Sequence, residues 1–162
     1  MAKKAAYGGV MTACALIFSY IEYLAPINIG FPGIKLGLAN IVIIIALYWL
    51  GVKYAFAINV TRIFIAALLF SGLYGMLFGL TGGILSLSLM ALLKRVDIFS
   101  VTGVSVVGGL AHNIGQLIAA SFLIANFAVV YYLPVLLISG ALTGVFIGVL
   151  SQIMLRRLGK MK

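Results

Sequence analysis

Acidic residues are almost absent from this chain of 162 residues, in which Glu22 and Asp97 are the only two. Catalysis that clamps a diphosphate through magnesium needs several carboxylates, so two isolated ones exclude it. The chain also has one histidine, His112, and one cysteine, Cys14. This scarcity excludes an internal disulfide and a zinc or haem site. Because no Walker motif and no set of nucleophile and base is present either, we expect no catalytic residue, no metal and no cofactor.

Charged residues of either sign are scarce, at 8% of the chain, whereas apolar residues make up 65%. The mean hydropathy is +1.29. A soluble domain is about half apolar and about a quarter charged, so this chain could not cover a surface that faces water. We therefore predict an all-α integral membrane protein that passes several times through the cytoplasmic membrane and contacts its lipids.

Six apolar runs are candidate transmembrane helices, for which roughly 20 residues are needed, and the second of them is short. They lie at about 5–25, 36–50, 54–70, 73–93, 99–127 and 131–155, and together they form a single transmembrane domain over residues 1–162. The N-terminus resembles a signal peptide, but its apolar run continues to Ala25 without a convincing cleavage site. We interpret it as a retained first helix.

The basic residues, which give a net charge of +9, fall mainly in the gaps between apolar runs or at the chain ends. Positive residues in short gaps orient helices toward the cytoplasm. Six spans with both termini cytoplasmic place nine of the eleven basic residues inside, and the exceptions are Lys35 and Arg62. Basic residues are not interleaved with aromatic ones, so a nucleic-acid partner is not expected.

Polar side chains inside the apolar runs are the candidate site residues. A charge at the bilayer centre costs at least ~2.5–3.5 kcal/mol, and such residues usually face a cavity or the bundle interior. We expect one outward-facing pocket, in which Lys35 and Arg62 hold an anionic group. The candidate ligand-binding residues are Glu22, Lys35, Asn40, Asn59, Arg62, His112, Asn113 and Gln116.

Structural roles are the alternative for these residues. Asn and Gln in membrane helices often only bond a neighbouring helix, and Arg62 could reach the interface or pair with Glu22.

Small residues recur at four-residue spacing in three of the apolar runs, which allows close approach of another helix. For Gly75–Gly79–Gly83 and Gly140–Gly144–Gly148 we expect packing inside the bundle. For Ala5, Gly9 and Ala13 the alternatives are internal packing and docking of a partner membrane protein.

Three segments carry a family resemblance: FPGIKLGLANIVIIIALYWLG, GGLAHNIGQL and YYLPVLLISGALTG. They resemble the Gx transporter family, also called heptaprenyl diphosphate synthase component I. More distantly, the chain is similar in architecture to the S components of energy-coupling factor (ECF) transporters. That likeness implies a six-helix bundle, a vitamin-like ligand captured from outside, and an ECF-type coupling subunit with ATPases docked at Ala5, Gly9 and Ala13.

Two functions follow as expectations. The first is a membrane subunit that binds or transports a small molecule, captured at the outer face and energised by a partner module. The alternative is a non-catalytic membrane component that serves polyprenyl diphosphate synthesis.

Overall fold

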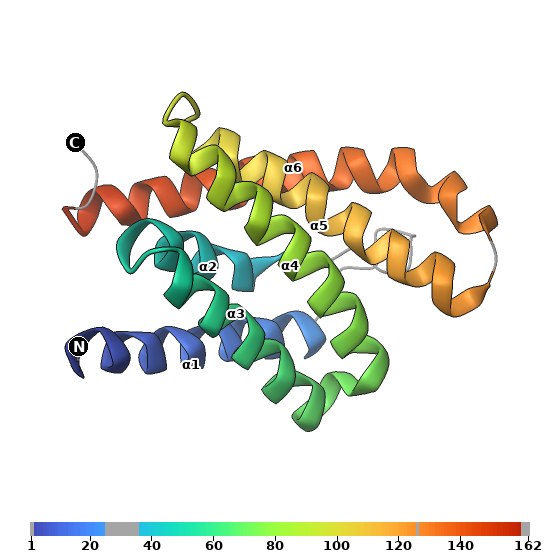
Figure 1. The fold of residues 1–162 in the computed structure, drawn as a ribbon, viewed down its shortest axis with the longest axis horizontal. Coiled ribbons are helices and arrows are strands. Elements are labelled where there is room, and N and C mark those ends of the chain that lie inside the picture. The colour runs from blue at the N-terminus through green and yellow to red at the C-terminus, as the bar shows by residue number, and fades with distance from the viewer. Residues whose placement is uncertain (1, 25–35, 126, 160–162) are drawn as a thin grey trace.

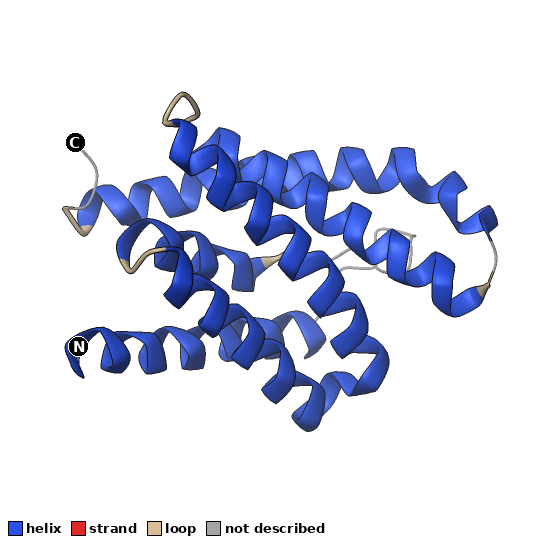
Figure 2. Cartoon of the chain, in the orientation of Figure 1, coloured by secondary structure: helices blue, strands red, loops and turns tan. Residues whose placement is uncertain are grey.

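The computed structural model describes residues 2–24, 36–125 and 127–159, which are helical almost throughout and contain no strand (Figures 1 and 2). The long helices are α1 (Ala2–Leu24), α2 (Leu38–Trp49), α3 (Val52–Ala66), α4 (Gly72–Val96), α5 (Val101–Ile124) and α6 (Leu133–Arg157). Two short segments complete the set, the π-helical η1 (Ala67–Ser71) and the 3-10 helix η2 (Phe127–Tyr132). The all-helical prediction is therefore confirmed.

Four stretches of the described chain are long and apolar enough to cross a membrane: Lys3–Leu24, Val52–Val96, Val101–Ile124 and Ala128–Arg157. The second has 45 residues, about twice what one crossing requires. It reverses direction at η1 and Gly72, whose φ of 65° suits glycine, so that α3 and α4 are two separate helices (Figure 1). A membrane protein is thus supported, and the count of six spans remains a prediction.

The apolar faces that point outward fit a lipid environment. Large apolar side chains such as Leu68, Phe122 and Leu142 are 85%, 83% and 68% exposed. In water such a surface would drive aggregation, whereas in a bilayer it contacts lipid tails of equal polarity.

Helix α2 forms the centre of the bundle. Its residues Ile41 to Leu47 are all buried, as expected for a helix that is apolar all round. It packs against α1, α3 and α6. Its twelve residues rise only about 18 Å, less than the ~30 Å hydrocarbon core of a bilayer. Helix α2 is therefore an internal core helix as much as a span.

Lys94 caps the C-terminal end of α2. From the sequence, this lysine was expected only to orient the helices in the membrane. Lys94, at the end of α4, donates from Nζ to the Leu47 carbonyl oxygen at 2.6 Å. The same ammonium group lies 5.0 Å from the centre of the Tyr48 ring. The last carbonyls of a helix have no partner within it and favour a cation, so Lys94 ties α4 to α2.

Helix α5 packs between α4 and α6 through glycines. A Cβ atom on Gly144 of α6 would lie 2.7 Å from the Val106 Cα atom, and one on Gly148 would lie 2.7 Å from the Thr102 Cα atom. On α4, Gly79 and Gly83 face Ile63 of α3 in the same way. The glycine strips of α4 and α6 therefore pack within the bundle, as predicted.

The basic side chains gather at one end of the bundle, here named the basic end. It comprises the start of α1, the junction of α2 and α3, and the ends of α4 and α6, which lie at the same end in Figure 1. Its basic residues are Lys3, Lys4, Lys53, Lys94, Arg95, Arg156 and Arg157. Of the basic residues that the structure describes, Arg62 alone lies elsewhere. That the basic end faces the cytoplasm remains a prediction of the charge pattern.

Candidate ligand-binding site

A cavity of about 400 Å³ lies between α1–α3 on one side and α4–α6 on the other. Cavities for small ligands usually measure about 300–1,000 Å³. Its lining follows α4 from Gly75 through Gly79 and Ser86 to Met90. Fifteen residues of helix rise about 22 Å, so the cavity is elongated along the bundle.

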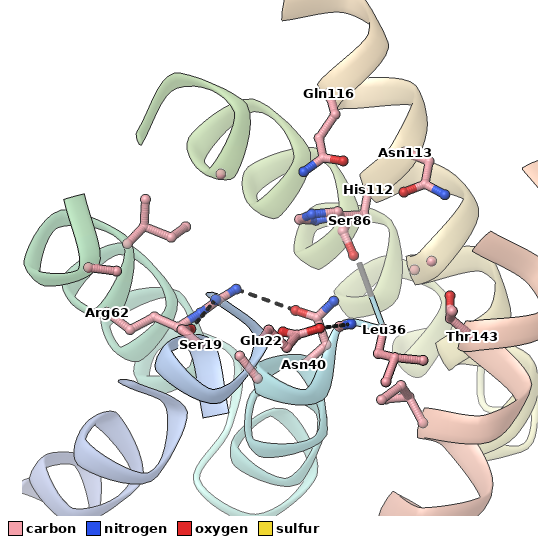
Figure 3. A pocket seen from close by; sticks show the side chains of 18 of the residues that line it. Ser19, Glu22, Leu36, Asn40, Arg62, Ser86, His112, Asn113, Gln116 and Thr143 are labelled. Carbon is pink, nitrogen blue, oxygen red and sulfur yellow. Dashed lines mark hydrogen bonds between the residues drawn. The ribbon is translucent and has the colours of Figure 1, made fainter. Parts of the chain in front are cut away.

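Arg62 projects from α3 into this cavity (Figure 3). Three neutral side chains hold it there. Its Nε and Nη2 atoms donate to Asn59 Oδ1 at 3.1 and 2.9 Å. Its Nη1 atom donates to Ser19 Oγ at 3.3 Å, and Nη2 also reaches Asn40 Oδ1 at 3.4 Å. Since all these acceptors are uncharged, the hydrogen bonds fix the guanidinium group without cancelling its charge.

Asn59 acts from behind Arg62 and does not line the cavity. It precedes Arg62 by three residues and therefore shares its helical face. Its side chain is only 2% exposed and packs against Gly83 of α4, where a Cβ would lie 2.7 Å from Asn59 Nδ2. The sequence predicted a ligand contact here, and the geometry gives Asn59 the role of positioning Arg62.

Glu22 lines the same cavity from the end of α1. Its Oε1 atom accepts a hydrogen bond of 2.5 Å from the Gly37 N–H, just before α2 begins. Gly37 has a left-handed φ of 76°, which a side chain would strain. Glu22 thus joins α1 to α2, and its carboxylate and the Arg62 guanidinium face one cavity without a direct hydrogen bond.

The wall opposite Arg62 is formed by α5. Its residues Ser105, His112 and Gln116 share one helical face at spacings of seven and four, while Asn113, next to His112, lies on the side toward α6. Asn113 Nδ2 donates to the Leu136 carbonyl oxygen of α6 at 2.6 Å. Asn113 therefore makes the helix–helix bond that was the structural alternative for it, while still bordering the cavity. His112 packs against Gly82 of α4, where a Cβ would lie 3.0 Å from its Nδ1 and Cε1 atoms.

The structure thus brings six of the eight predicted residues to one cavity: Glu22, Asn40, Arg62, His112, Asn113 and Gln116. Lys35 lies outside the described residues, and its predicted role stays a prediction. Sequence reasoning missed the hydroxyl groups of Ser19, Ser86, Ser105 and Thr143, which also line the cavity. Ser105 precedes His112 by seven residues, or two helical turns, and this spacing could have placed it on the same helical face.

The polar groups of the cavity indicate which class of ligand it would hold. Within the described ranges no group of three His, Cys, Asp or Glu residues could hold a metal ion. The cavity offers one fixed guanidinium group, the Glu22 carboxylate and the His112 ring, with hydroxyl and amide groups around them. Four of the five guanidinium N–H groups make the bonds described above, so one is left for a ligand. A charged donor bonds most strongly to phosphate and carboxylate oxygens, so an anionic group is the matching ligand.

Comparison with known proteins gives one match. The family model described as heptaprenyl diphosphate synthase component I matches residues 11–154, nearly the whole chain. Searches of curated proteins and of solved structures found no match. The family resemblance that the sequence suggested is thereby confirmed under its second name, and the likeness to ECF transporters remains an expectation. The chain belongs to the heptaprenyl diphosphate synthase component I family.

Proposed function

We propose that this protein is a membrane subunit that binds an anionic small molecule in its cavity and serves a partner synthase subunit. The family description names a synthase of heptaprenyl diphosphate, which is an anion of this kind. Component I is the non-catalytic part of that synthase, in agreement with the expectation that the chain is not an enzyme by itself. Catalysis therefore belongs to the partner subunit, and binding to this chain.

The environment of Arg62 is the observation that carries the proposal. A guanidinium group within a membrane bundle costs at least ~2.5–3.5 kcal/mol, so it needs a compensating role. Its direct partners are the neutral side chains of Asn59, Asn40 and Ser19. No carboxylate bonds the guanidinium group directly, and Glu22 acts on it only across the cavity, so its charge stays available to a ligand there. A purely structural role, in which Arg62 only ties α1, α2 and α3 together, uses the same bonds and must be separated by experiment.

Isothermal titration of the detergent-solubilised protein with inorganic diphosphate and with geranyl diphosphate tests the anion site. We expect Arg62→Gln to weaken binding about 10- to 150-fold, since a hydrogen bond to a charged group contributes about 1.5–3 kcal/mol. Arg95→Gln removes the same charge at the exposed basic end and should leave the affinity unchanged.

A second variant separates binding from folding. Asn59→Asp places a carboxylate against Arg62 Nε and Nη2 and so neutralises the guanidinium group while keeping its hydrogen bonds. We expect a folded protein with normal helix content and little diphosphate affinity. Tight binding by both Asn59→Asp and Arg62→Gln would contradict the proposal, and so would a wild-type protein that binds neither diphosphate.

Capture of the ligand from the outer face, as part of transport, is a second candidate. It is favoured by the position of Glu22 and Gly37, which line the cavity at the end of α1 that is remote from the basic end. If the basic end faces the cytoplasm, these residues face outward. In a Cys14→Ala background, Glu22→Cys should then react with a membrane-impermeant maleimide in whole cells, and Lys53→Cys should not. The reverse pattern would contradict outward capture.

Partner docking on α1 remains part of this second candidate. Ala5, Gly9 and Ala13 are exposed along α1, and a Cβ on Gly9 would meet nothing within 4 Å. The strip is therefore free for another helix, whether from a synthase subunit or from a coupling subunit of the ECF kind. Co-purification with wild-type protein that is lost with Gly9→Leu would support docking there, and unchanged co-purification would contradict it.

A further inference from the structure

Hydroxyl groups on the helices of this protein commonly bond their own backbone. Five of them, those of Thr12, Ser19, Thr81, Ser121 and Thr143, donate at 2.9 Å to the carbonyl oxygen four residues earlier. In a membrane, where water is not at hand, this bond satisfies a polar side chain without a partner on another helix. Among the buried serines of the described chain that do not make this bond, Ser151 lies outside the cavity and its hydroxyl group has no partner, whereas two others line the cavity.

Ser86 of α4 and Ser105 of α5 are two such serines. Their side chains are 3% and 2% exposed, and both line the cavity. No hydrogen bond joins either hydroxyl group to any other group in the part of the chain that the structure describes. They lie on adjoining walls, because a Cβ on Gly108, one turn along α5 from Ser105, would be 3.3 Å from Ser86 Oγ. Figure 3 shows Ser86 between His112 and Asn40 in this view.

This pair is separate from the Arg62 cluster along the bundle. Asn59 and Ile63, on either side of Arg62 in α3, pack against Gly83 of α4. Ser86 lies about one helical turn from Gly83, toward the basic end. Apolar side chains of Ile44, Met90 and Ile147 also line the cavity. The cavity therefore has a charged region at Arg62 and a neutral hydrogen-bonding region further inside, with apolar surface around them.

We propose that Ser86 and Ser105 form a second subsite, which hydrogen-bonds a neutral polar group of the ligand such as a hydroxyl or a carbonyl. This inference rests on the proposed function for the other end of the ligand, the anionic group at Arg62. The ligand class is then a compact molecule with an anionic group at one end and a neutral hydrogen-bonding group in its body. A plain prenyl chain has no such group beyond its diphosphate and would leave both buried hydroxyls unpaired.

Matched diphosphates test the second subsite. The probes are dimethylallyl diphosphate, geranyl diphosphate and the analogue of each that carries a hydroxyl group at the far end of its chain. At one or both chain lengths, wild-type protein should bind the hydroxylated probe about three- to tenfold more tightly, as one net hydrogen bond implies. Ser86→Ala/Ser105→Ala should lose this preference, and it should bind the plain probes at least as tightly as wild-type protein, because no hydroxyl group is then left unpaired. Ser121→Ala is the control, because its hydroxyl group bonds Leu117 and lies outside the cavity lining.

The outcomes separate the two proposals. Equal affinity for plain and hydroxylated probes in wild-type protein at both lengths would overturn the second subsite, and so would a preference that survives in the double variant. If the plain probes still bind in an Arg62-dependent way, the proposed function stands. If wild-type protein binds no probe, the anion site fails and the second subsite falls with it. If Arg62→Gln binds all probes as tightly as wild-type protein and keeps the preference for the hydroxylated ones, the second subsite stands and the anion site is wrong.

Discussion

Replacing Gly148 with alanine tests the close packing of α5 against α6, which forms one wall of the cavity. The added Cβ would lie 2.7 Å from the Thr102 Cα atom and 2.9 Å from Ser105 Cβ. Ordinary contact begins at 3.4 Å, so the two helices must separate by roughly 0.7 Å at this point. Overpacking of this kind costs about 1–3 kcal/mol, while alanine in place of glycine returns up to ~1 kcal/mol of helix propensity. We expect a net loss of about 1–2 kcal/mol.

Reversible unfolding in mixed micelles of a mild detergent and dodecyl sulfate measures this loss, with far-ultraviolet circular dichroism as the signal. Gly9→Ala is the matched control, since it is the same substitution within an exposed helix where the Cβ meets nothing within 4 Å. It should stabilise the protein by about 0.5–1 kcal/mol. If Gly148→Ala is as stable as Gly9→Ala, α5 and α6 do not pack as closely at Gly148 as the reasoning requires.

Three further substitutions test other contacts in the same assay. Lys94→Met removes the hydrogen bond to the Leu47 carbonyl and should lower the free energy of unfolding by about 1.5–3 kcal/mol. The neighbouring Arg95→Met should change it by less than ~0.5 kcal/mol. Equal effects of the two substitutions would contradict the capping role of Lys94. Asn113→Leu removes one helix–helix bond and should cost about 0.6 kcal/mol, and a loss above ~2 kcal/mol would mean that Asn113 does more than bond α6. Gly37→Ala forces a side chain into a left-handed conformation and should cost about 1–2 kcal/mol; no loss would refute that backbone geometry.

Much of the fold could be predicted from the sequence because apolar run length decides where helices form in a membrane. The expected runs at 73–93 and 131–155 correspond closely to α4 and α6. The central position of α2 could not be predicted, because an apolar run has the same composition whether its side chains face lipid or protein. The second role of Lys94 was equally hidden, because capping of α2 depends on how α4 packs across it.

The part of the candidate site around Arg62 was predictable, because a charged residue within an apolar run and a polar residue at helical spacing indicate one polar face. Arg62 was predictable because it is a charged residue within an apolar run. Asn59 was expected on the same helical face, and its uncharged side chain accepts two hydrogen bonds from Arg62. The buried hydroxyls of Ser86 and Ser105 were missed because serine is common in membrane helices and usually bonds its own backbone. They differ from Ser19, which also lines the cavity, because Ser19 bonds its own backbone and they do not.

The central claim is that Arg62 holds an anionic molecule in the cavity, and native mass spectrometry of protein extracted gently from its own membrane tests it most directly. The account predicts that wild-type protein retains an anionic small molecule and that Arg62→Gln, purified in parallel, has lost it. Wild-type protein with no bound molecule, or a molecule retained equally by Arg62→Gln, would contradict the account.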